Sequence, residues 1–239
     1  MDPLDRLAEP GLDLLRRVDI LLATGAPEGH RVWPLLRRMQ VLPGAAVRSF
    51  LELPAAAFSD AGRSVRQLAR GYDEASAALT EPVLWSGAAA TAFGEYRAAL
   101  LRHFDEGPES LVGRLESTAG YADAIAEWIE GSRRTLARTL AGALGSTEAV
   151  AVVAATSAPT AASAQFAVSV PHPAAEVEAA EIAARVLAVL SAAYDGVESL
   201  LRHWGPNLAE SPWRAPVIET PRYDTPTHVD GEHPCAGRE

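Results

Sequence analysis

Apolar residues in the middle of the chain recur at alternating steps of three and four, which is the spacing of a helical stripe. The residues in two such series are Val65, Leu68, Tyr72, Ala75, Leu79 and Val83, then Ala89, Phe93, Tyr96, Leu100 and Phe104. Between the series stands Trp85-Ser86-Gly87, whose glycine is free to adopt a positive φ. The pattern predicts an antiparallel helical hairpin, with the Trp85 ring closing one end of the seam between its arms.

Proline and glycine mark where the helical spacing stops on either side of this hairpin. An N-terminal helix begins at Leu4 and is expected to be interrupted at Pro10, and short apolar runs follow it as far as Pro54. Glu106-Gly107-Pro108 must interrupt the second arm, because proline lacks a backbone donor and clashes with the preceding turn. The spacing then resumes and continues to Gly145.

These signals divide the chain into four parts. Short helices over 1–54 are expected to pack on one end of the bundle, and the hairpin occupies 55–145. A further helical pair over 146–205, whose first member is a weakly amphipathic helix over 146–164, completes the bundle. Residues 206–239 are rich in proline and scattered charge, so we expect a disordered tail that cannot bury enough apolar surface to order itself.

The composition supports an all-α fold for the whole chain. Hydrophobic residues make up 48% of the 239 residues, whereas aromatic residues make up only 6%. Much of the hydrophobic content is alanine, which has the highest helix propensity and lets helix axes approach closely. No stretch shows the strict alternation of a half-buried strand. The chain is long enough to bury a core of its own.

The charge of the chain excludes several classes of partner. The formal net charge is −10 and every basic residue is arginine, so binding to nucleic acid or to an anionic membrane is not expected. The single cysteine, Cys235, excludes an internal disulfide. Residues 149–175 contain no Asp, Glu, Lys or Arg, but polar residues and prolines interrupt them, so no membrane span is expected. The acidic start lacks the features of a classical signal peptide.

The residues around Trp85 resemble a known family. Trp85-Ser86-Gly87, the small residues after it and then Phe93 and Tyr96, with helices predicted on both sides, are similar to the WxG (ESAT-type) family of type VII secretion substrates. The resemblance covers roughly residues 58–144. It implies a hairpin that pairs with a second copy or another helical protein into a four-helix bundle, with Trp85, Gly87, Phe93 and Tyr96 at the turn and the binding surface. It also implies a cytoplasmic protein that the secretion machinery exports.

Two features of the chain depart from that family. Its additional helices before and after the hairpin are placed to cover the stripe that family members use for pairing. The family's export tag, Tyr-x-x-x-Asp/Glu, is also missing where it is expected, since that place holds Trp128-Ile129-Glu130-Gly131-Ser132. Tyr194 and Glu198 match the tag near the end of the last helix, where their spacing puts both on one face. An ordinary solvated pair is the alternative interpretation.

No group of residues in the sequence indicates catalysis. The six histidines are scattered, and no phosphate loop, dinucleotide fingerprint or Gly-x-Ser-x-Gly elbow is present. His228, Asp230, His233 and Cys235 are metal-binding types, but they lie in the predicted tail without a scaffold. The arginine pairs, including Arg133-Arg134, are interpreted as solvated helix faces.

The prediction is therefore a non-enzymatic protein with no catalytic residues, metal or cofactor, which acts by binding a helical partner or a second copy of itself. Two alternatives stay open. One is a cytoplasmic helical adaptor or chaperone in which Trp85-Ser86-Gly87 is accidental and the helices form one closed bundle. The other is a small enzyme with a pocket that the sequence does not reveal.

Overall fold

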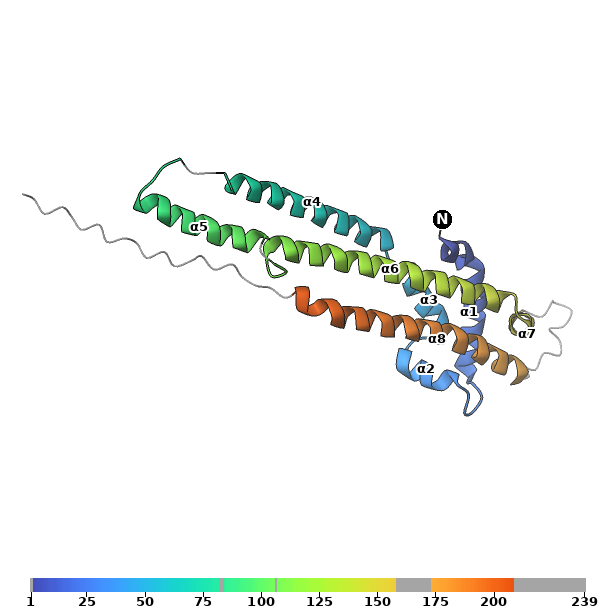
Figure 1. Cartoon of the computed structure of the whole chain (residues 1–239). Coiled ribbons are helices and arrows are strands. Elements are labelled where there is room, and N and C mark those ends of the chain that lie inside the picture. Colours follow the sequence, from blue (N-terminus) through green and yellow to red (C-terminus); the bar gives the residue numbers. More distant parts are fainter. Residues whose placement is uncertain (1, 82–83, 106, 158–172, 209–239) are drawn as a thin grey trace, which may run out of the picture.

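The computed structural model describes residues 2–81, 84–105, 107–157 and 173–208, and every regular element in these ranges is a helix (Figure 1). In chain order the elements are α1 (Pro3–Thr24), α2 (Val32–Met39), α3 (Pro43–Leu51), α4 (Ala55–Leu79), α5 (Ala88–Asp105), α6 (Leu111–Leu144), α7 (Thr147–Thr156), α8 (Pro173–Trp204) and the 3-10 helix η1 (Gly205–Leu208). The predicted all-α class is confirmed.

The two longest helices, α6 and α8, lie side by side and run in opposite directions (Figure 1). In each of the two helices, a glycine packs against the ring of a tryptophan from the other helix. A Cβ atom on Gly120 would stand 2.7 Å from Cη2 of Trp204, and one on Gly196 would stand 3.4 Å from Nε1 of Trp128. In both helices the tryptophan follows the glycine by eight residues, so the two contacts together fix one antiparallel register.

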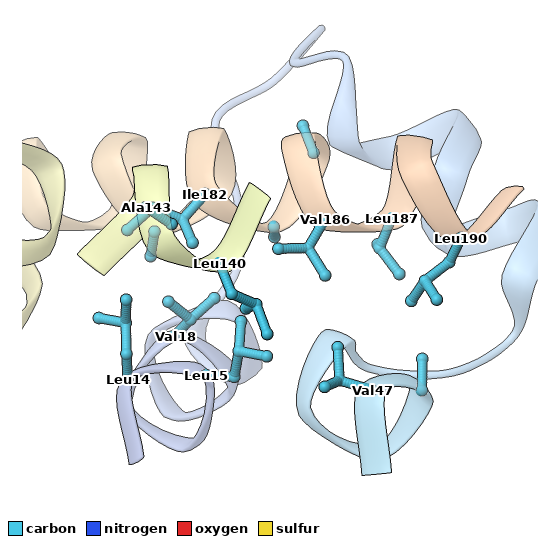
Figure 2. Packing of buried hydrophobic residues seen from close by; sticks show 14 of the residues in the cluster. Leu14, Leu15, Val18, Val47, Leu140, Ala143, Ile182, Val186, Leu187 and Leu190 are labelled. Carbon is cyan, nitrogen blue, oxygen red and sulfur yellow. The ribbon is translucent and has the colours of Figure 1, made fainter. Parts of the chain in front are cut away.

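The hydrophobic core lies where α1 and α3 cross this pair of helices (Figure 2). The labelled side chains that meet there are Leu14, Leu15 and Val18 of α1, Val47 of α3, Leu140 and Ala143 of α6, and Ile182, Val186, Leu187 and Leu190 of α8. Several buried positions of α8 are alanines, which allow neighbouring helices to approach closely. α7 packs against the end of α8 nearest this core.

The expected interruption at Pro10 is wrong, because α1 is one continuous helix of 22 residues that contains Pro10. Proline removes one backbone hydrogen bond, but the residues around it are held by packing: Gly11 lies directly against Leu140, and Leu14 and Leu15 are buried. The helix is also capped at its start, where Asp2 accepts a hydrogen bond from the backbone N–H of Leu4. Of the helices predicted to be short over 1–54, α2 and α3 are short, with 8 and 9 residues.

α4 packs along α6 through small residues spaced seven apart. Gly62, Ala69 and Ser76 are its buried residues, and a Cβ on Gly62 would stand 3.3 Å from the carbonyl oxygen of Ala119. The predicted stripe is therefore wrong in its register. It joined Val65, Tyr72 and Leu79, which are half-buried beside the small residues, to Leu68 and Ala75, which are exposed. We call the buried and half-buried set on this side of α4 the inner stripe: Phe58, Gly62, Val65, Ala69, Tyr72, Ser76 and Leu79.

α4 and α5 are two separate helices joined by residues 80–87. α4 lies along α6 and then beside α5, and α5 extends past the end of α8 (Figure 1). The rings of Tyr72 and Phe104 lie 5.8 Å apart, and Nη1 of Arg97 donates a hydrogen bond to the carbonyl oxygen of Glu81 at 2.7 Å. None of the described side chains of α5 is fully buried. We call residues 72–105 the arm.

Three sequence predictions fall partly or wholly outside the described residues. The helix predicted over 146–164 ends at Thr156 in the structure, and residues 158–172 are not described. The tail predicted over 206–239 begins within η1, and residues 209–239, which include the His228–Cys235 set, are not described.

Candidate interaction surface

Three large apolar side chains gather where the connection of the arm meets α5. Leu84 is 99% exposed, Trp85 is 51% exposed and Phe93 is 44% exposed. The rings of Trp85 and Phe93 lie 5.9 Å apart in a tilted arrangement. We call these three residues the apolar tip. The sequence led us to expect that Trp85 would close the seam, but half of its surface faces solvent, so it adds to an exposed patch instead.

Gly87 adopts the positive φ that the sequence analysis anticipated, at +108°. The next residue begins α5, and the carbonyl oxygen of Gly87 accepts a hydrogen bond from the backbone N–H of Thr91 at 3.1 Å. No other group lies within 4 Å of the place where a Cβ would stand. The conformation of the backbone, and not crowding, is therefore what favours glycine here.

Replacing Gly87 with valine is expected to lower the free energy of unfolding of the arm by about 1–2 kcal/mol, because a β-branched residue is strained at this φ. Urea denaturation followed by circular dichroism measures the change, and amide hydrogen exchange in α5 locates it. Ser86→Val, at the exposed neighbouring position, is the matched control and should change stability by less than about 0.5 kcal/mol. Equal effects of the two variants would contradict a turn that depends on Gly87.

Tyr96, the fourth residue of the predicted binding surface, lies on α5 one turn after Phe93 and is half-buried. The structure therefore brings Trp85 and Phe93 into contact, with Gly87 setting the direction of the chain between them. Leu84, which directly precedes Trp85, was not singled out by the sequence analysis. Its exposure depends on the path of the connection, which no spacing pattern reports.

Tyr194 and Glu198, the candidate export tag, lie on α8 and not on the arm. Glu198 is exposed, and Tyr194 is about half-exposed. The rings of Tyr194 and of Phe50 in α3 meet in a T-shaped arrangement, with their centroids 6.3 Å apart. The ring centroids of Phe50 and Trp128 lie 5.8 Å apart, so Tyr194 stands at the border of a packed aromatic cluster. The tag residues and the apolar tip therefore form two separate surfaces.

Arg133 is buried, so the interpretation of Arg133-Arg134 as a solvated pair is wrong for its first member. Its guanidinium donates to Asp2 and, at 2.5 Å, to Oδ1 of Asp5. Nη1 also donates to the carbonyl oxygens of Phe50 and Leu51, at 3.0 Å each. We call these five residues the Arg133 clamp. It joins α6 to the start of α1 and the end of α3.

The clamp perturbs the titration of Asp2. Partial burial acts to raise the pKa of this carboxyl, but the hydrogen bonds from Arg133 and from the backbone N–H of Leu4 outweigh it, and the pKa of Asp2 is lowered from its ordinary value. A sequence signal for this burial existed. Position 133 lies on the same helical stripe as Ile129, Leu136 and Leu140, all of them buried.

Within the described residues no three His, Cys, Asp or Glu side chains are grouped so as to hold a metal ion. A groove between α1 and α7 of about 490 Å³ is lined mainly by apolar residues such as Leu14, Leu144 and Val153. No single helix in the described ranges has both the length and the apolar character to cross a membrane, although two bent helix pairs pass the same test of length and composition.

Comparison of the chain with protein-family models, with curated proteins and with solved structures finds no match.

Proposed function

We propose that this protein is a non-enzymatic helical interaction protein that binds another helical protein through the α4–α5 arm. The observation that carries the proposal is the apolar tip, where Leu84 is almost fully exposed and the contacting rings of Trp85 and Phe93 are about half-exposed. Burying a large apolar side chain contributes about 1.5–3 kcal/mol. Clustered exposed apolar residues of this kind mark interaction surfaces on soluble proteins.

The packing of α5 supports the same proposal. α5 packs against α4 and α6, and none of its described side chains is fully buried. A helical partner laid against the arm would bury the second side of α5, as happens when two helical hairpins form a four-helix bundle. The partner therefore needs an apolar helical face, and the tip would supply the aromatic anchor of the contact.

The resemblance to the WxG family extends the proposal to type VII secretion. In that case the protein is a secretion substrate or an associated factor, and Tyr194 and Glu198 form the export tag. The exposure of Glu198 and the half-exposure of Tyr194 on one face of α8 support this part, since a recruiting protein needs access to both. Export assays of Tyr194→Ala and Glu198→Ala chains in a host with a type VII system test it, with the partly exposed Glu178→Ala as the control.

An adaptor or chaperone without a link to secretion is the second candidate. It is favoured by the extent of the fold outside the hairpin, since α1, α3 and α8 build the main core together with α6. Such a protein would use the same apolar tip but would be indifferent to Tyr194 and Glu198. Export of the unmodified chain together with loss of export in both tag variants would decide against this candidate.

The tip itself is tested by site-specific photo-crosslinking in cells of the source organism. A crosslinking residue at position 84 should capture a helical partner that the same residue at position 150 of α7, also exposed and apolar, does not capture. With that partner purified, the double variant Trp85→Ser, Phe93→Ser should bind at least about tenfold more weakly than the unmodified chain. Equal capture from the two positions, or unchanged affinity, would contradict the proposal.

A further inference from the structure

Part of the chain beyond η1 has the composition of a ligand for exposed aromatic rings. The sequence continues for 31 residues after Leu208, the last described residue. We call residues 212–223 the proline segment, because it has prolines at positions 212, 216 and 221. Its large apolar residues are Trp213, Val217, Ile218 and Tyr223. Proline-rich segments bind to surfaces lined by aromatic side chains, since their extended form loses little conformational entropy on binding.

The apolar tip is an aromatic surface of this kind, and the described helices leave it open. Trp85 and Phe93 are in contact with each other, yet about half of each side chain is exposed. Among the described helices, α5 packs extensively only against α4 and α6. One face of α5 is open along its length, since exposed residues recur on it at steps of three and four: Ala88, Thr91, Glu95, Ala98 and Arg102.

Charge also favours the proline segment as the occupant of this surface. The segment contains two arginines and one glutamate, although the whole chain has a formal net charge of −10. The outer part of the arm, residues 72–98, contains one arginine and four acids, and all four acids are exposed: Asp73, Glu74, Glu81 and Glu95. Residues 224–239 contain four acids and one arginine, so the same surface would repel them.

The proline segment begins within reach of the tip. The ring of Trp204 lies against Gly120, and Figure 1 shows α5 continuing in nearly the direction of α6. Gly120 lies about 14 Å along α6 from its start, and the 18 residues of α5 add about 27 Å. The 15 residues that follow Leu208 and end at Tyr223 can span about 46 Å. Tyr223 can therefore reach the apolar tip.

We propose that the proline segment binds along α5 and over the apolar tip of its own chain, with Trp213 near the base of the arm and Tyr223 at the tip. The short connection to Leu208 gives the chain's own segment a local concentration of the order of millimolar, which favours it over the segment of a second copy. A partner that binds the arm must displace the segment first, and this regulatory role rests on the proposed function.

The contact is tested in the purified full-length chain, with the photo-crosslinking residue at position 84 and no partner present. Mass spectrometry should place the crosslinks within residues 217–228, whereas the same residue at position 150, also exposed and apolar in the unmodified chain, should give none there. A mixture of isotopically labelled and unlabelled chains shows whether each crosslink joins one chain or two. Crosslinks that miss residues 217–228, that form equally from position 150, or that join only different chains would overturn the proposal.

The roles of charge and of the aromatic ring are tested by variants of the segment. Arg222→Glu should lower the crosslinking yield from position 84 at least about threefold, because it replaces attraction to the acidic arm with repulsion. Tyr223→Ser should lower it by a similar factor. Arg238→Glu is the matched control and should leave the yield unchanged. Equal yields from all these variants and the unmodified segment would show that the segment is not bound at the tip, and would overturn the proposal.

These measurements separate the bound segment from the proposed function, because they need no partner. Failure to capture a partner in cells would contradict the proposed function and leave the crosslinks within the purified chain in place. With a partner purified, the Arg222→Glu chain should bind it at least about threefold more tightly than the unmodified chain, since less of the segment has to be displaced. Unchanged affinity would overturn the regulatory role and leave the proposed function standing.

Discussion

Replacing Arg133 with methionine is expected to lower the free energy of unfolding by about 3 kcal/mol. The guanidinium is buried and uses its donors on the carboxylates of Asp2 and Asp5 and on the carbonyl oxygens of Phe50 and Leu51. Methionine fills a similar volume but donates nothing. Its introduction would leave two half-covered carboxylates and two carbonyl oxygens without their donor, while the start of α1 would lose its connection to α6.

Arg134→Met is the matched control, since Arg134 is the next residue of α6 and is exposed. It should change the free energy of unfolding by less than about 0.5 kcal/mol. Urea denaturation of the two variants beside the unmodified chain measures both values. A loss of the same size in the two variants would mean that the Arg133 clamp contributes no more than an ordinary surface arginine.

The clamp also predicts how stability depends on pH. The pKa of Asp2 is lower in the folded chain than its ordinary value of about 3.9, so its ionised form stabilises the fold above that pH. This contribution is lost as the pH falls from about 4 through the lowered pKa of the folded state. Between pH 5 and pH 3 the melting temperature of the unmodified chain should therefore fall further than that of Arg133→Met, in which the main partner of Asp2 is missing.

The helical class and the breaks between helices could be predicted from the sequence because they depend on local chemistry. Alanine-rich spacing of three and four is enough to indicate helices, and glycine marks the places where φ becomes positive. Gly87 and Gly107 have φ of +108° and +89°, and each lies between two helices, as expected. Pro10 shows the limit of such local rules, because burial of Leu14 and Leu15 keeps α1 continuous through it.

The register of packing could not be predicted in the same way. The prediction for α4 followed the largest apolar residues, but a helix that approaches its neighbour closely does so through its smallest ones. Gly62, Ala69 and Ser76 are therefore the buried residues of α4, and Leu68 is left exposed. Arg133 was missed for a related reason, since a charged residue on a buried stripe looks like a surface residue until the carboxylates that pair with it are located, far away in the sequence.

The candidate site was predicted in part. Phe93 was assigned to the binding surface together with Trp85, and the two rings are in contact. The exposure of Trp85 was not predicted, because it depends on how far the arm extends past α8, and that follows from the contacts of Gly120 and Gly196 with two other tryptophans. The sequence did contain a signal for those contacts, because in each of two helices a tryptophan follows a glycine by eight residues. The signal can be interpreted only once the two helices are known to be antiparallel.

The two tryptophans, Trp128 and Trp85, should therefore differ widely in what they contribute to stability. Trp128→Ala is expected to lower the free energy of unfolding by about 3 kcal/mol, because the ring packs against Phe50 and Gly196 and its Nε1 donates to the carbonyl oxygen of Ala193 at 2.9 Å. Trp85→Ala should cost less than about 1 kcal/mol, because half of the side chain, which packs against Phe93, is already in water.

Trp128→Phe separates the two parts of that loss, since it keeps most of the apolar contact and removes the N–H donor, and it should cost about 1 kcal/mol. Denaturation followed by circular dichroism measures all three variants without depending on tryptophan fluorescence. A cost for Trp85→Ala equal to that for Trp128→Ala would mean that Trp85 holds the fold together and is not free to bind a partner. A small cost at Trp85 with a large one at Trp128 would instead support a surface kept for binding, because the chain then exposes an indole that contributes little to its own stability.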